Sequence, residues 1–174
     1  MKRLSLVLGS VLAVAAVALL VAMASAQGHQ SLKARLSGFQ EVPAISTAGS
    51  GEFRAKIRPD GSSVDYTLSY QNLEAATLFA HIHLSARGVN GGVMAFLCGG
   101  GGKPACPSNV GFNTVSGTIA PADVVGPAGQ GVAAGEFAEF IRALRSGATY
   151  ANVHTTLFPG GEIRGQISTD DEDN

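Results

Sequence analysis

Apolar and polar residues alternate with a period of two along several short stretches of this chain, and no other feature constrains its fold as strongly. The alternation is clear over residues 32–38, 51–57 and 64–71. Because successive side chains on a strand point to opposite faces, each stretch predicts a half-buried β-strand. The last two stretches are separated by Pro59-Asp60-Gly61, which is typical of a turn. Residues 51–71 are therefore predicted to form a β-hairpin.

Further strands are predicted along the rest of the chain, at residues 77–84, 93–97, 112–119, 150–155 and 162–167. Helical periodicity occurs once, where four apolar residues follow the spacing i, i+3, i+4, i+7: Phe137, Phe140, Ile141 and Leu144. This spacing predicts one short helix near residues 135–146, and the chain's twenty-three glycines suit many turns. We expect an all-β fold, an antiparallel β-sandwich or barrel like that of immunoglobulin domains or Cu/Zn superoxide dismutases.

The start of the chain has the features of a secretory signal peptide. A short basic start precedes an unbroken apolar run over residues 11–23, and the small residues Ala24-Ser25-Ala26 follow it. We predict that residues 1–26 are a signal peptide and that the protein is secreted or periplasmic, without stable membrane insertion after cleavage. The alternative is a retained membrane anchor, because the apolar stretch approaches the roughly 20 residues that span a bilayer.

The remaining chain is long enough for a single domain, which we place at residues 27–168. Residues 169–174 are mostly acidic and contain no hydrophobic residue, so we expect a disordered acidic tail. Without the signal peptide, ten basic residues face thirteen acidic ones. This balance argues against nucleic acid as a partner.

The two cysteines, Cys98 and Cys106, flank a glycine-rich segment that is flexible enough for the sulfurs to meet. In an oxidising compartment they are predicted to form a disulfide. Their spacing differs from the Cys-x-x-Cys motif of redox enzymes, and the sequence also lacks the Gly-x-Ser-x-Gly and His-Glu-x-x-His motifs of hydrolases.

Two histidines lie two residues apart in the apolar stretch 77–84. On a strand His81 and His83 would share one face, and the rings would stand opposite the apolar side chains. If the strand that carries His154 pairs nearby, the three imidazoles could hold copper or zinc. Glu162 and Asp65 are candidates to accept hydrogen bonds from the rings and so to orient them toward a metal. Alternatively, the histidines are structural and bond neighbouring backbone or carboxylate groups.

A separate copper motif would arise at the mature N-terminus. Cleavage after residue 26 exposes Gln27-Gly28-His29, where an amine, two amide nitrogens and an imidazole can surround Cu(II) in a square plane. Cyclisation of the glutamine would remove the amine.

Several sequence blocks, in order, resemble the CHRD domain, a module repeated in chordin and found singly in exported microbial proteins. The resemblance covers about residues 31–167 and rests on Leu36 to Pro43, Ala80 to His83, Gly88 to Gly91, Leu144 to Gly147, Tyr150 to Thr155 and Pro159 to Gln166. It implies an extracytoplasmic β-sandwich-like domain without an assigned activity. The His-Ile-His segment is also similar to the copper strand of Cu/Zn superoxide dismutases, but the bridging histidine and the zinc ligands have no counterpart here.

These observations predict a secreted, non-enzymatic binding module with a three-histidine face for copper or zinc. The second hypothesis is an extracellular adhesion or envelope-interaction module with structural histidines. A copper-dependent oxidoreductase is the third. The partner would be an extracellular protein or an envelope ligand.

Overall fold

A computed structural model describes residues 30–109 and 111–169 of the chain. This part contains eight strands, all antiparallel to their neighbours. The strands are β1 Gln30–Ser37, β2 Ser50–Ile57, β3 Val64–Gln71, β4 Thr77–Leu84, β5 Gly92–Cys98, β6 Asn113–Ile119, β7 Thr149–Thr155 and β8 Ile163–Thr169. The predicted all-β class is confirmed.

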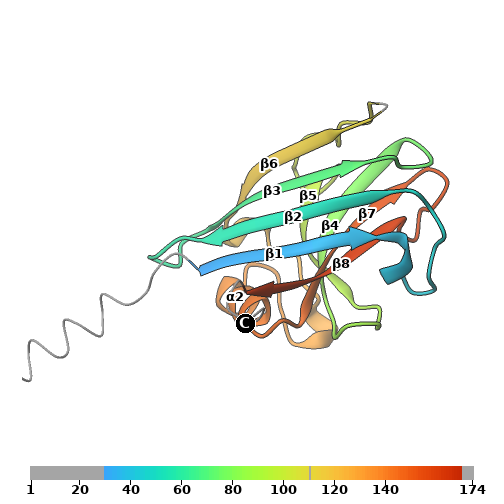
Figure 1. Ribbon diagram of the computed structural model, residues 1–174. Coiled ribbons are helices and arrows are strands. Elements are labelled where there is room, and N and C mark those ends of the chain that lie inside the picture. Colours follow the sequence, from blue (N-terminus) through green and yellow to red (C-terminus); the bar gives the residue numbers. More distant parts are fainter. Residues whose placement is uncertain (1–29, 110, 170–174) are drawn as a thin grey trace, which may run out of the picture.

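The strands form one sheet in the order β5-β4-β7-β8-β1-β2-β3-β6, which curves into a nearly closed barrel (Figure 1). The predicted hairpin is confirmed, since β2 pairs with β3 and Ile57 lies opposite Val64. The connection between them contains Gly61, whose φ of 67° favours glycine. The sheet also brings β4 and β7 side by side, although they are far apart in the sequence.

The interior of the barrel is filled by the apolar residues of the alternating strands. Phe53 on β2, Leu68 on β3, Ile82 on β4 and Val153 on β7 are all fully buried. The predicted helix is confirmed as α2, Phe137–Arg145, which lies beside the end of β8 (Figure 1). Its apolar stripe faces this interior, so the helix adds its own hydrophobic face to the barrel core.

Three short 3-10 helices complete the described structure: η1 Gly38–Gln40, η2 Pro121–Asp123 and η3 Ala128–Gln130. The segment after residue 120 helps to close the barrel, because Val124 forms an isolated bridge with Ala95 on the edge strand β5. On the other edge, β6 pairs only with β3. The Tyr66 hydroxyl on β3 donates to the carbonyl of Leu97 on β5 at 2.6 Å, which ties the two edges together.

The predicted disulfide is confirmed, since Cys98 at the end of β5 bonds to Cys106. A disulfide is typical of proteins that fold in an oxidising, extracytoplasmic environment. In the described residues, no helix is long and apolar enough to cross a membrane.

Some sequence predictions lie outside the described residues. These are the signal peptide of residues 1–26, the N-terminal copper motif of residues 27–29 and the acidic residues 170–174. Thr169, which we assigned to the tail, is the last residue of β8 and is buried.

Candidate metal centre

The three predicted histidines come together on two neighbouring strands. His81 and His83 project from β4, and His154 projects from β7. One ring nitrogen of each histidine lies within 4.8 Å of the other two. His81 Nδ1 and His154 Nε2 are 3.2 Å apart. Since β4 and β7 are paired with Phe79 opposite His154, the register of the sheet sets this convergence.

The histidines stand on the outer face of the barrel, opposite the hydrocarbon core, yet they are buried. Their neighbours Ala80 and Ile82 point into the core. Only 5–8% of the surface of each histidine is exposed. Loops fold over this face and bond to the rings, through the carbonyls of Gly91 and Pro159.

The bonds to the loops define the protonation of two rings. A carbonyl only accepts, so Nδ1 of His83 donates to the Gly91 carbonyl, and Nδ1 of His154 donates to the Pro159 carbonyl, both at 2.9 Å. In each neutral ring Nε2 then carries the lone pair. His81 Nδ1 donates to His154 Nε2 in this state. His83 Nε2 is buried and has no hydrogen-bond partner within the part of the chain that the structure describes.

Aromatic side chains enclose the rings. His81 stacks on Phe79, with ring centroids 4.8 Å apart, and meets Phe96 of β5 edge-on at 4.4 Å. His83 lies parallel to Tyr150, with the centroids 4.7 Å apart and an angle of 4° between the planes. The rings are therefore held in fixed orientations by stacking as well as by hydrogen bonds.

This environment keeps the three imidazoles neutral. Burial, reinforced by the neighbouring His154 and His83, lowers the pKa of His81 from 6.5 to about 3. Burial also lowers the pKa of His154 to about 4, against the opposing effect of the Pro159 carbonyl. The pKa of His83 is lowered mainly by burial. Neutral imidazole is the form that binds metal ions.

The separations suit a metal ion after a small inward movement. Two nitrogens bound to one metal at about 2.0–2.1 Å lie about 3.3–3.6 Å apart in tetrahedral or trigonal geometry. The distance of 3.2 Å between His81 Nδ1 and His154 Nε2 matches this. Three atoms within 4.8 Å of one another all lie within about 2.8 Å of a common point. The longest of the three distances between the nitrogens must become shorter, by rotation of a side chain, before all three nitrogens can bind one ion.

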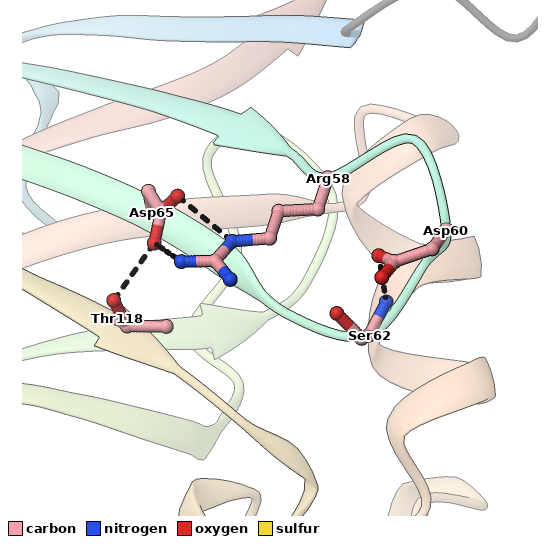
Figure 2. Close-up of polar contacts among 5 residues, drawn as sticks. All are labelled: Arg58, Asp60, Ser62, Asp65 and Thr118. Carbon is pink, nitrogen blue, oxygen red and sulfur yellow. Dashed lines mark hydrogen bonds and ion pairs between the residues drawn. The ribbon is translucent and has the colours of Figure 1, made fainter.

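Among the described residues, neither of the two carboxylates predicted to orient the rings is hydrogen-bonded to a histidine. Asp65 on β3 accepts hydrogen bonds from Arg58 and from the Thr118 hydroxyl on the solvent-facing side of the sheet (Figure 2). The same figure shows the backbone amide of Ser62 donating to Asp60 in the adjoining turn. The structure therefore does not bring Asp65 to the histidines, because β3 is not a neighbour of β4 or β7.

Glu162 is fully buried, and the hydrogen bonds that it forms with described residues go to groups other than the rings. Its carboxylate accepts from the hydroxyls of Thr155 and Thr47 and from the backbone amide of Glu74. Thr155 follows His154 on β7, so Glu162 fixes the end of that strand. The groups that orient the rings directly are the backbone carbonyls of Gly91 and Pro159.

A second polar layer lies beside the histidines and was missed by the sequence analysis. Arg164 on β8 is 1% exposed and lies over the ring of Tyr150, with its central carbon 3.4 Å from the ring centroid. It donates to the carbonyl of Val89 and to the side chain of Asn90, which holds that loop over the sheet. Since β7 lies between β4 and β8, Tyr150 separates Arg164 from His83.

Glu41 belongs to the same layer. Its carboxylate accepts from the Asn152 amide at 2.6 Å, and burial raises its pKa from 4.5 to about 7, although Arg164 and Asn152 oppose the rise. Together with Arg164 it borders a hollow of about 290 Å³. A Cβ at Gly161 would lie 2.5 Å from the Asn152 amide nitrogen, so glycine is required where this loop approaches the layer.

Sequence signals for this layer were weak. Arginine and glutamate are usually exposed, and period-two alternation assigns Arg164 to the face opposite the core without showing that loops cover that face. The glycines of the two covering loops could have indicated a close approach of these loops to the sheet, but glycine is too common in this chain for that signal to be specific.

Comparison with known protein families matches residues 32–167 to the CHRD domain. No curated protein and no solved structure matches the chain. The matched residues run from β1 to β8 and include the whole barrel and all three histidines. Because the match covers most of the chain, the protein belongs to the CHRD domain family.

Proposed function

We propose that this CHRD domain is an exported binding module whose histidines His81, His83 and His154 hold a copper or zinc ion. The observation that carries the proposal is the buried Nε2 of His83, which has no hydrogen-bond partner among the described residues and belongs to a ring with one nitrogen within 4.8 Å of a nitrogen of each of the two other rings. Export is supported by the disulfide between Cys98 and Cys106 and by the predicted signal peptide.

An unsatisfied buried nitrogen is costly. Leaving such a group without a partner costs about 1–3 kcal/mol, because it loses its hydrogen bonds to water and gains none. A metal ion bound to the lone pair of His83 Nε2 would remove this cost. The Nδ1 hydrogen bond to the Gly91 carbonyl already leaves the lone pair on Nε2, as a metal ligand requires.

Binding needs one change of tautomer. His154 already presents the Nε2 lone pair, because its Nδ1 donates to Pro159. In the metal-free protein, His81 Nδ1 carries the proton that bridges to His154 Nε2. For His81 to bind through Nδ1, this proton must move to Nε2 of the same ring. The ring stays neutral, so no charge is added to the site by this step.

A second candidate function rests on the same hydrogen bonds. The His81–His154 bond and the two bonds to loop carbonyls would also fasten the loops if the histidines were purely structural. The domain would then be an adhesion or envelope-interaction module, and its partner an extracellular protein or envelope ligand. This function leaves the orphaned nitrogen of His83 without a role.

The two functions are distinguished by metal titration of the domain, purified without a metal-affinity tag. We expect the parent protein and a His29→Ala variant to bind one copper or zinc ion in calorimetry and to melt at a higher temperature with it. An ion present at 100 times its Kd stabilises the folded state by about 2.7 kcal/mol. The triple variant His81→Ala/His83→Ala/His154→Ala, made in the His29→Ala background so that no N-terminal copper motif remains, should show neither effect.

Binding by the triple variant as tight as that of the parent would overturn the metal proposal. Structural histidines predict a different pattern. Each of the variants His81→Ala and His154→Ala would lose about 1–3 kcal/mol of stability from broken hydrogen bonds, and metal would leave the melting temperature unchanged. His29→Ala removes the one histidine outside the cluster, so it controls for copper held at the N-terminus.

A further inference from the structure

The three-histidine cluster supplies no negative charge. Among the described residues, no aspartate, glutamate or cysteine joins the histidines as a fourth potential ligand. Cys98 and Cys106 are joined to each other, Asp65 is paired with Arg58, and Glu162 is bonded to threonine hydroxyls and a backbone amide. An ion held by three neutral imidazoles would therefore keep its full positive charge.

A fixed positive charge lies one ring away. The Arg164 guanidinium stacks on Tyr150, and the opposite face of Tyr150 stacks on His83. Among the described residues no carboxylate forms an ion pair with Arg164, although Glu41 lies near enough to influence it. The guanidinium adds to the repulsion felt by a cation at the histidines, and this repulsion doubles for an ion of twice the charge.

Burial increases the penalty for a doubly charged ion. The cost of moving an ion out of water rises with the square of its charge, so a divalent ion pays about four times as much as a monovalent one of similar size. The histidines are 5–8% exposed, and Phe79, Phe96 and Tyr150 pack against them. Little water is available to offset the charge.

The number of ligands leads in the same direction. Zinc is almost always four-coordinate, and a three-histidine zinc site takes a water or substrate as its fourth ligand. A monovalent d¹⁰ ion is satisfied by three nitrogen ligands in a plane. The cluster provides three nitrogens, and the side chains of Phe79 and Phe96 that pack against His81 offer no ligand atom for a fourth position.

We infer that the cluster selects copper in its +1 state over divalent zinc, with one nitrogen each of His81, His83 and His154 as the complete ligand set. The inference rests on the proposed metal-binding function and adds the identity and charge of the ion. The uncompensated charge, whose cost burial increases, and the three-ligand count both support it.

The test compares the two ions on one protein, the His29→Ala variant, in which every remaining histidine belongs to the cluster. Cu(I) is added under anaerobic conditions in competition with bicinchoninate, and Zn(II) in competition with a chromophoric zinc chelator. We expect Cu(I) to bind at least 100-fold more tightly. X-ray absorption of the copper complex should show three nitrogen ligands at about 2.0 Å and no fourth.

Two substitutions connect the preference to the residues. His83→Phe keeps an aromatic ring against Tyr150 but removes a ligand, and should weaken Cu(I) binding at least 100-fold. Arg164→Met removes the buried charge, and should narrow the ratio between Cu(I) and Zn(II) affinities. The exposed Arg35→Met serves as the matched control and should leave the ratio unchanged.

The outcomes separate this inference from the proposal beneath it. Zinc binding as tightly as Cu(I), or a fourth ligand on copper, would overturn the preference and leave metal binding in place. If neither ion binds in a manner that depends on the three histidines, both the preference for Cu(I) and the proposed metal-binding function are wrong. Should Arg164→Met fail to fold, the ratio measured on the parent and on Arg35→Met still decides the question.

Discussion

His81, His83 and His154 share one small buried space, and each resists protonation chiefly because burial would separate the positive charge from water. The lowered pKa values of His81 and His154, about 3 and about 4, reflect that shared burial. An unfolded chain has no such restriction, and its imidazoles titrate near 6.5. The difference makes the stability of the metal-free protein depend on pH.

The first prediction concerns this pH dependence. As the pH falls below about 6.5, the unfolded chain takes up protons that the folded protein refuses, so the free energy of unfolding should decrease between about pH 6.5 and about pH 3. A unit of pKa corresponds to about 1.4 kcal/mol, so His154 alone accounts for roughly 3 kcal/mol. Urea unfolding of metal-free protein at several pH values measures it.

Glu41 changes the free energy of unfolding with pH in the direction opposite to the histidines, so the prediction needs a control that isolates one histidine. Its pKa is raised from 4.5 to about 7, so between these values the folded protein holds a proton on Glu41 that the unfolded chain has lost. The stability that this group contributes is therefore lost as the pH rises through about 7. One glutamate offsets only part of the effect of three histidines. His154→Gln should reduce the slope below pH 6.5 by about one proton, and an unchanged slope would contradict the assignment.

Arg164 is the residue that joins the loop at Val89 to the sheet. Arg164→Met would remove its bonds to the Val89 carbonyl and to Asn90, at 2.6 and 3.1 Å, and its stacking on Tyr150. We expect a loss of about 2–4 kcal/mol in chemical denaturation, since hydrogen bonds to a charged group are each worth about 1.5–3 kcal/mol. The exposed Arg35→Met should change stability by less than about 0.5 kcal/mol.

The sequence predicted the three histidines of the cluster but not the groups that orient their rings. His81 and His83 were recognisable because alternation placed both on one face of a strand. The carbonyls of Gly91 and Pro159 orient the rings instead of the expected carboxylates of Asp65 and Glu162. Every residue carries a carbonyl, so no sequence pattern marks the ones that a folded loop brings to a ring.

At the scale of elements, the strands and the helix were predictable because each is amphipathic. The pattern of β3 alternates buried and partly exposed residues over its whole length. The helix is amphipathic too, although α2 begins and ends one or two residues inside the predicted range. Helix ends depend on capping contacts, which periodicity does not reveal.

The helix supplies the third prediction. Phe140 on α2 is fully buried against the barrel core, so Phe140→Ala should destabilise the protein by about 3–5 kcal/mol through the cavity it leaves. Phe112 is 66% exposed, and Phe112→Ala offers the same chemical change outside the core. Thermal unfolding followed by circular dichroism compares the two. Equal losses would show that α2 is not part of the core.

At the scale of the whole molecule, the sequence predicted an antiparallel β fold but left a sandwich and a barrel open. The strand order decides between them, and it depends on pairings between distant segments such as β1 with β8 and β4 with β7. Hairpins are encoded locally by turns, whereas these pairings are fixed by burial in the complete chain. Local patterns therefore could not supply the order.

The fourth prediction concerns the place where the two edge strands of the sheet, β5 and β6, come together to close the barrel. The Cys98–Cys106 bond closes a short loop, so the double variant Cys98→Ser/Cys106→Ser should lose about 2–3 kcal/mol. It should still fold, because the Ala95–Val124 bridge and the Tyr66–Leu97 hydrogen bond also tie the edges. Far-ultraviolet circular dichroism and thermal melting test both points, and loss of β structure at low temperature would contradict the second.

The histidines lie outside the hydrophobic core, on a face of the sheet that loops cover. From these two strands the core of the barrel takes Ala80 and Ile82 of β4 and Ala151 and Val153 of β7, and none of the histidines. Substitutions of the histidines or changes in the covering loops can therefore occur without altering the packing of the barrel core. Members of the family with the same architecture need not share one chemistry, and each must be judged by the side chains beneath its own loops.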